Sequence, residues 1–245
     1  RVLGGLGTAY GAVDPDIIGW WWFDEGGGAT ATDSSGNGNN GTLMGGASWA
    51  PGYFRTALQL DGVDGYVEVP HDPSLNVDGE ATVMAWINTP RRETPGQGYQ
   101  GVIGKGNGTA RSYSLYTTPN NLHFSTGPSG AYIGSSSSTG AIPINEWVHV
   151  CGMIISNGHQ YYVNGEDAGR FANGAVGPGA ADTENLVIGR TQEGTSRSFE
   201  GLIDDVRIYR RGLTHRGQSR PRRRPAGCAP RRGSLLDAGR ICRDA

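Results

Sequence analysis

A chain of 245 residues with 36% hydrophobic side chains is long enough to bury a sizeable core. Its 42 glycines and 13 prolines separate short runs rich in Val, Ile, Tyr and Trp, which predicts many turns and few helices. No run of about 18 apolar residues occurs, which excludes a membrane-spanning helix. The net charge of −2 is unevenly spread. Arginines gather in residues 215–245, and the acidic remainder favours cations over nucleic acid.

The first predicted element follows a small, glycine-rich leader at residues 1–16. Residues 17–23 are apolar and too short for a helix between glycines, which predicts a strand. Side chains of a strand alternate between its faces, so Trp20, Trp21 and Trp22 cannot all face the core. We assign Trp20 and Trp22 to the core, and we expect Trp21 to be exposed or covered by another layer.

A loop of Asp, Ser, Asn and Gly follows this strand. Asp24, Glu25 and Gly27 lie at its start, and Asp33 and Asn37 come further on. Their side chains and carbonyl groups offer many oxygens, which suit Ca²⁺. The same residue types also form Asx-turns that hold a long connection together. Metal binding and turn formation therefore remain two alternatives for this loop.

The middle of the chain alternates between strands and turns. Residues 58–70 predict two strands joined by a tight turn, and Asn164-Gly165 predicts a type I′ hairpin turn. Further strands are predicted at 82–87, 102–103, 113–116, 122–124, 147–155 and 186–189. About a dozen short strands and no convincing helix predict an all-β fold, a two-sheet antiparallel jelly-roll sandwich. The expected core side chains are Trp86, Trp147, Val148 or Val150, Leu202, Val206 and Ile208, with Trp86 among the most costly to truncate.

The last predicted strand, residues 199–209, carries a carboxylate on an apolar face. With strict alternation, Asp204 shares a face with Leu202 and Val206, while Asp205 points the other way. A buried carboxylate must be paired, hydrogen-bonded or bound to metal. Asp204 is therefore expected to bind a metal ion or to belong to a hydrogen-bond network.

The chain's motifs, taken in order, resemble a known family. They are Trp-Trp-x-Phe-Asp-Glu-Gly, Asp-Ser-Ser-Gly-Asn-Gly, Leu-Asp-Gly-Val-Asp-Gly-Tyr-Val-Glu-Val-Pro, Ala-Trp-Ile, Glu-Trp-Val-His-Val, Tyr-Val-Asn-Gly and Ile-Asp-Asp-Val-Arg-Ile-Tyr. This order is similar to that of bacterial laminin-G-like jelly rolls of the concanavalin A-like lectin/glucanase superfamily. The resemblance implies two curved sheets, an extracellular setting, a structural Ca²⁺, and carbohydrate or protein ligands.

The same resemblance suggests ligands for the metal. In such folds the aspartate of the final strand binds Ca²⁺ together with carbonyls near the N-terminal strand. On this sequence the match is Asp204 with backbone oxygens around residues 24–28, joined by Asp33 or Asn37. The resemblance covers residues 17–214, which we predict to be one domain. It does not extend to residues 215–245, an Arg/Pro-rich segment that we predict to be a disordered tail or a linker.

Catalytic machinery is not apparent in the sequence. Retaining glycoside hydrolysis needs two carboxylates about 5–5.5 Å apart, and the Glu-x-Asp-x-x-Glu pattern of laminarinases does not occur. We therefore predict a protein that is not an enzyme, and a diverged glycoside hydrolase stays as an alternative.

The sequence favours a secreted or cell-surface binding module, stabilised by calcium, that serves carbohydrate recognition or adhesion. Its expected partner is a carbohydrate or an extracellular protein, with no nucleic acid and no membrane span, and nothing in the sequence specifies an oligomeric state. Sugar sites combine aromatic faces with amides and carboxylates. The candidate ligand-binding residues are Trp49, Tyr53, Tyr99, Asn107, Asn120 and Tyr132. A structural or protein-interaction module without a sugar site is the alternative.

Overall fold

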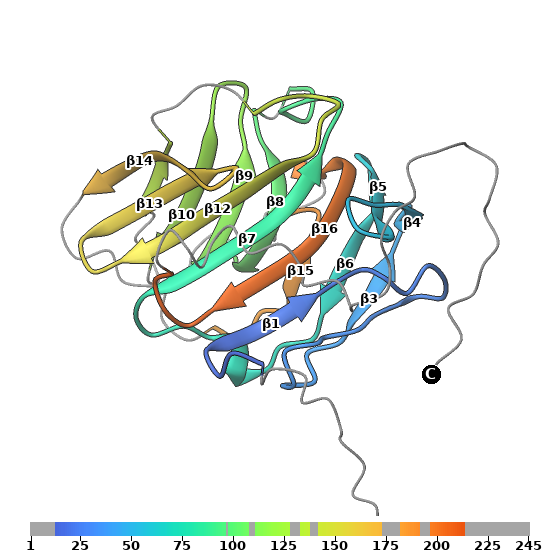
Figure 1. The fold of residues 1–245 in the computed structure, drawn as a ribbon, viewed down its shortest axis with the longest axis horizontal. Coiled ribbons are helices and arrows are strands. Elements are labelled where there is room, and N and C mark those ends of the chain that lie inside the picture. The colour runs from blue at the N-terminus through green and yellow to red at the C-terminus, as the bar shows by residue number, and fades with distance from the viewer. Residues whose placement is uncertain are drawn as a thin grey trace, which may run out of the picture.

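The computed structural model describes residues 13–96, 98–107, 111–127, 133–137, 142–172, 182–191 and 197–213. These residues form two antiparallel sheets packed face to face, with one 3₁₀ turn at Pro73–Leu75 (Figure 1). The predicted all-β jelly-roll sandwich is confirmed. Within the described ranges no helix has the length and hydrophobicity to cross a membrane.

The sheet nearer the viewer in Figure 1, which we call sheet A, has eight strands in the order β14-β13-β12-β7-β16-β5-β4, with β1 paired to β16. Its strands are β1 (Ile17–Trp21), β4 (Ser48–Pro51), β5 (Thr56–Asp61), β7 (Ala81–Asn88), β12 (Val148–Ile155), β13 (Gly158–Val163), β14 (Glu166–Ala172) and β16 (Glu200–Tyr209).

The second sheet, sheet B, lies behind it and has the order β11-β10-β9-β8-β15-β6-β3-β2. Its strands are β2 (Thr30–Ala31), β3 (Gly41–Met44), β6 (Tyr66–Val69), β8 (Gln100–Gly106), β9 (Arg111–Thr117), β10 (Leu122–Gly127), β11 (Ile133–Ser136) and β15 (Leu186–Ile188). Apolar side chains from the facing surfaces of the two sheets fill the space between them and form the main core.

The closing strand β16 does not alternate strictly, because it contains a β-bulge. Ile203 lies opposite Ile87, and Asp204 lies opposite Trp86. The register then shifts before Arg207, and Asp205 adopts a left-handed backbone with φ of 49°. A bulge adds one residue to a strand and so changes which residues face inward beyond it.

The bulge overturns the predicted faces of this strand. Ile203, Val206 and Ile208 belong to the main core, so the residues between Ile203 and Val206 lie on the outer face of sheet A. Asp204 therefore does not share a face with Val206, and Asp205 does not point away from Asp204. Both of these predictions were wrong because the alternation of residue types hides the extra residue.

The tryptophans also depart from the prediction. Trp21 is fully buried in the main core, and its indole Nε1 donates to the carbonyl oxygen of Asn39 at 2.9 Å. Trp20 and Trp22 are only half-buried. Neighbouring side chains of a strand point to opposite faces. Because Trp21 faces the core, Trp20 and Trp22 face away from it.

Three of the other predicted core residues also lie outside the core: Trp86, Trp147 and Leu202. All three are half-buried rather than buried in the core. On β7 the inward residues are Val83, Ala85 and Ile87, so Trp86 lies on the outer face. The remaining core predictions are confirmed: Val148, Val150, Val206 and Ile208 are all buried.

Of the two predicted turns, one forms a hairpin. Asn164 and Gly165 have φ values of 52° and 79°, as a type I′ turn requires, and they join β13 to β14. By contrast, β5 and β6 belong to different sheets, so the turn at residues 61–65 crosses the sandwich. Asp61 organises this crossing, since its Oδ1 accepts the amide N–H groups of residues 63, 64 and 65.

The start of the described chain is bound to its end. Arg211 forms ion pairs with Asp14 and Asp16, and the amide of Arg210 donates to the carbonyl of Asp16 at 2.9 Å. The folded body thus begins before Ile17, inside the predicted leader. Residues 1–12 and the predicted tail at 215–245 lie outside the described ranges.

Truncating Trp21 should destabilise the fold more than truncating Trp86. Trp21→Ala removes a fully buried indole and is expected to lower the free energy of unfolding by about 3–5 kcal/mol. Trp86→Ala, at a half-buried position, should cost about 1–2 kcal/mol. Urea unfolding of both variants measures the difference, and equal losses would contradict the observed faces of β1 and β7.

Removing residues 215–245 should leave the thermal midpoint of unfolding within about 2 °C of the full chain. The described body ends with Leu213, which is 5% exposed and whose amide donates to the Thr82 hydroxyl at 3.1 Å. A cut after Thr214 keeps this contact. Calorimetry of the truncated and full chains tests the expectation, and a clear drop would show that the removed segment stabilises the sandwich.

Candidate functional site

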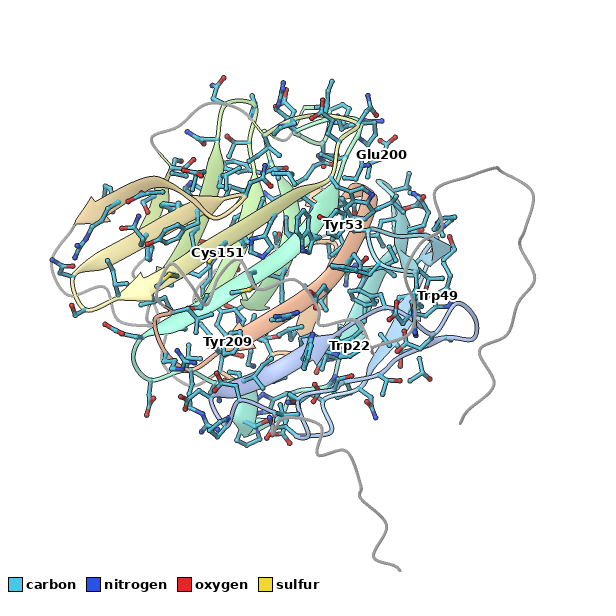
Figure 2. All side chains as sticks on the ribbon, in the orientation of Figure 1. Trp22, Trp49, Tyr53, Cys151, Glu200 and Tyr209 are labelled. Atoms are coloured by element: carbon cyan, nitrogen blue, oxygen red, sulfur yellow. The ribbon has the colours of Figure 1, made fainter. Side chains whose placement is uncertain are left out.

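Three aromatic rings meet on the outer face of sheet A, and we call them the aromatic corner. The Tyr53 ring stacks on Trp86 with centroids 3.8 Å apart and an interplanar angle of 16°. Trp147 lies 5.9 Å from Tyr53, tilted by 57°. Tyr53 is 42% exposed, and Figure 2 shows it over β7 and β16 on the near side of the molecule. The arrangement presents one exposed ring with a second ring at an angle beside it.

The hairpin between β4 and β5 carries Tyr53 to this position. The Phe54 amide donates to Oδ2 of Asp204 at 2.9 Å, and the Thr56 hydroxyl donates to the carbonyl of Phe23 at 2.7 Å. Phe54 also packs edge-on against Tyr53, with centroids 4.7 Å apart. The turn includes Arg55 in a left-handed backbone conformation, with φ of 49°. Hydrogen bonds thus attach the hairpin both to β16 and to Phe23, which follows the first strand.

A histidine lies beside the aromatic corner. The His149 ring is 5.3 Å from Trp86, and the residue is 7% exposed. Its Nδ1 is buried and has no hydrogen-bond partner. Burial lowers the pKa of His149 to about 4, while the nearby Asp205 raises it and Arg207 lowers it further. The ring is therefore neutral at physiological pH and carries one N–H donor and one acceptor nitrogen.

The second carboxylate of the bulge is paired with cationic and indole donors. Asp205 accepts hydrogen bonds from Nε and Nη2 of Arg207 at 3.0 and 2.7 Å, and from the indole of Trp20 at 2.8 Å. The Arg207 guanidinium also lies 4.7 Å from the centre of the Trp20 ring. Both bulge carboxylates are at most 3% exposed. Neither presents an open carboxylate of the kind that attacks a glycosidic bond.

The loop predicted to bind calcium is organised by hydrogen bonds of the chain itself. Asp33 accepts the amides of Trp20, Ser35 and Asn39 and the Ser35 hydroxyl, at 2.7 to 3.0 Å. Glu25 accepts the Thr32 amide. These contacts are of the kind expected if the loop forms Asx-turns, which was the alternative to metal binding.

The other predicted metal ligands lie close to the same connection. The Asn37 side-chain amide donates to the carbonyls of Ile17 and Ile18, which occupies oxygens near the N-terminal strand. Asp24 and Gly27 follow Phe23, whose carbonyl oxygen accepts the hydroxyl of Thr56 in the β4–β5 hairpin. Asp204 reaches the same hairpin through Phe54. Among the described side chains no group of three or more His, Cys, Asp and Glu is placed to hold a metal, so a calcium site here would depend on backbone oxygens.

Of the five predicted ligand-binding residues that the structure describes, only Tyr53 belongs to the aromatic corner. Trp49 packs beside Phe23 and donates to the carbonyl of Gly28, and Figure 2 shows it apart from Tyr53. Tyr99 lies with Tyr116 and His123 on the outer face of sheet B.

Three polar or aromatic candidates remain. The Asn107 amide donates to Glu184 at 3.0 Å, and Asn120 is exposed in the turn between β9 and β10. Tyr132 lies outside the described residues. Sequence reasoning missed Trp86 and Trp147 as site residues because it placed both in the core. The run Val83, Ala85, Ile87 fills the inner face of β7, but Met84 and Trp86 make the other face apolar as well, so the sequence gives no clear signal for the side of Trp86.

Known solved structures share this architecture. Domain 4 of an extracellular arabinanase from Geobacillus stearothermophilus, solved with arabinotriose, is 20% identical with a TM-score of 0.66 over 83% of this chain and 97% of that one. The binding domain of Paraclostridial mosquitocidal protein 1 is 16% identical, with a TM-score of 0.67 over 83% of this chain and 51% of that one. The receptor-binding domain of a botulinum neurotoxin C/D mosaic is 15% identical, with a TM-score of 0.62 over 83% of this chain and 50% of that one. The chain thus spans about half the length of each toxin domain.

Sequence comparison places the chain in a family. No curated protein sequence matches it. A family model described as the concanavalin A-like lectin/glucanases superfamily matches residues 61–216, which is more than half of the chain. The chain belongs to the concanavalin A-like lectin/glucanase superfamily.

Proposed function

We propose that this domain is a carbohydrate-binding module whose ligand stacks on the aromatic corner. The observation that carries the proposal is the exposed face of Tyr53, supported from below by Trp86 and flanked by Trp147. Aromatic faces accept the apolar C–H surface of a sugar ring, and a tilted second ring limits how that sugar can lie. A tyrosine held on another ring also loses little conformational freedom when a ligand binds.

Polar groups beside the rings support the same function. Sugar sites need a few placed hydrogen-bonding groups to fix the orientation of hydroxyls. His149 lies next to Trp86, is neutral, and has an Nδ1 without a hydrogen-bond partner, so we propose it as the polar group of the site.

The similar solved structures support a carbohydrate-binding function but do not identify the ligand of this domain. An extracellular arabinanase domain of the same architecture was solved with arabinotriose. We infer a secreted or cell-surface location and a carbohydrate ligand by this analogy. We propose a non-catalytic role, which the hydrogen bonding of Asp204 and Asp205 to donors of the chain supports.

We also propose that Ca²⁺ binds Asp204 together with backbone oxygens around residues 24–28. Asp204 contacts the β4–β5 hairpin through the Phe54 amide and is 0% exposed. The carbonyls of Phe23 and Gly28, at the two ends of the segment, contact Thr56 and Trp49 of the same hairpin. Ca²⁺ tolerates the irregular oxygen geometry of such loops. Asp33 and Asn37 already take part in hydrogen bonds within the loop. To bind either residue as well, the ion would have to compete with those bonds.

Removing an aromatic ring from the corner should abolish most sugar affinity. A glycan array identifies the ligand of the wild-type domain, and titration calorimetry then measures the variants. Tyr53→Ala and Trp147→Ala should each weaken binding at least about tenfold, because each deletes a stacking surface. Phe171→Ala is the matched control, since Phe171 is a 36%-exposed aromatic on the edge strand β14.

Two results would contradict the proposal. Equal affinity of wild type, Tyr53→Ala and Trp147→Ala would place the sugar elsewhere on the domain. A wild-type domain that binds no glycan on a broad array would favour the alternative of a protein-interaction module.

Calcium should stabilise the fold if the metal proposal holds. A ligand that binds only the folded state raises the midpoint of unfolding with its concentration. Melting in about 5 mM Ca²⁺, roughly five to fifty times the dissociation constants of extracellular calcium sites, should shift the midpoint upward relative to excess EGTA. Asp204→Asn should lose this shift. Identical midpoints in calcium and in EGTA would refute the metal.

A further inference from the structure

One partly buried hydrogen bond connects the closing strand to the residue that follows Tyr53, whose ring a sugar would meet. We propose that Asp204 is a positioning residue of the aromatic corner. Its carboxylate accepts a hydrogen bond from the β4–β5 hairpin and so keeps Tyr53 stacked on Trp86. The consequence for sugar affinity rests on the proposed function, whereas the positioning itself does not.

The bulge in β16 puts the Asp204 carboxylate where it can do this. Ile203 and Val206 both face the core, so Asp204 lies on the outer face, directly opposite Trp86 in the neighbouring strand. Its Oδ2 accepts the amide N–H of Phe54 at 2.9 Å. Phe54 follows Tyr53 in the chain, so one hydrogen bond fixes the backbone beside the tyrosine.

The two ends of this hydrogen bond differ in rigidity. Asp204 belongs to a strand that is paired with β5 and β7 on its two sides. Tyr53 belongs to a hairpin turn, and solvent reaches its ring, which is 42% exposed. A bond from an amide to a buried carboxylate is stronger than one between neutral groups. The rigid strand therefore sets the position of the turn, and the turn sets the position of the ring.

Pre-positioning of the ring matters for binding. A tyrosine that must be ordered by its ligand costs part of the binding free energy, whereas a ring already stacked on Trp86 does not. Loss of the Asp204 acceptor should accordingly weaken sugar binding, although Asp204 is fully buried and is not expected to contact the sugar.

Three variants, studied in EGTA so that calcium does not contribute, test the proposal. Asp204→Ala removes the acceptor and should weaken binding of the array-identified glycan about tenfold. Asp204→Asn keeps an amide oxygen that accepts the Phe54 N–H and should stay within about threefold of wild type. Thr82→Val is the control: it removes the hydrogen bond from the Thr82 hydroxyl to the Arg211 carbonyl, at the other end of β7, and should lower the midpoint of unfolding without changing affinity.

A second readout reports the position of Tyr53 without a ligand. Stacking on Trp86 shifts the Tyr53 ring protons upfield in the NMR spectrum, and this shift should disappear in Asp204→Ala and persist in Asp204→Asn and Thr82→Val. If Asp204→Ala does not fold, Asp204→Ser takes its place, because the shorter side chain withdraws the acceptor.

Two outcomes would overturn the positioning role. One is an unchanged Tyr53 ring shift in Asp204→Ala. The other is a loss in Asp204→Asn as large as in Asp204→Ala, which would mean that the charge matters rather than the acceptor. If the wild-type domain binds no glycan, the proposed function is wrong. The Tyr53 ring shift still tests the positioning role of Asp204 in that case.

Discussion

The β-bulge at Asp204 and Asp205 is the feature on which the outer face of sheet A depends. It turns two consecutive carboxylates to one side of a central strand and still returns Val206 and Ile208 to the core. Asp204 then binds the β4–β5 hairpin, and Asp205 binds Arg207 and the Trp20 indole. Because a buried carboxylate without donors is costly, each aspartate fixes the segment that supplies its donors. One local irregularity thus attaches two separate parts of the chain to β16.

The two faces of sheet A consequently have different roles. The inner face is apolar and contributes to the main core, and its stability comes from area removed from water. The outer face combines aromatic rings with paired charges: Tyr53, Trp86 and Trp147 lie beside His149 and the Asp205–Arg207 ion pair. A half-buried aromatic surface with fixed polar neighbours gains less for folding than a core does. It offers more to a ligand that carries both C–H surfaces and hydroxyl groups.

Much of the fold follows from local patterns in the sequence. The Asn164-Gly165 turn needs two residues with positive φ, and the short alternating runs between glycines could only become strands. Buried Asp204 could be predicted to need a partner from chemistry alone, and it has one in the Phe54 amide. These inferences depend only on neighbouring residues or on the properties of one side chain.

The remainder depends on contacts between distant residues. The bulge changes the face of Asp204 without changing the residue types around it, so alternation gave the wrong side. On β7 both faces carry large apolar residues, and only the assembled sheet shows that Trp86 faces outward. The stacking of Tyr53 on Trp86 joins a hairpin turn to a strand far along the chain, and no local pattern indicates it.

The central claim is that a sugar binds at the aromatic corner, and the indole N–H signals of the tryptophans test it most directly. In a two-dimensional NMR titration with the glycan identified on the array, the signals of Trp86 and Trp147 should move. The Trp21 and Trp49 signals should stay in place, because these indoles donate to the carbonyls of Asn39 and Gly28 away from the corner. Binding that moves other indole signals and leaves those of Trp86 and Trp147 unchanged would contradict the account.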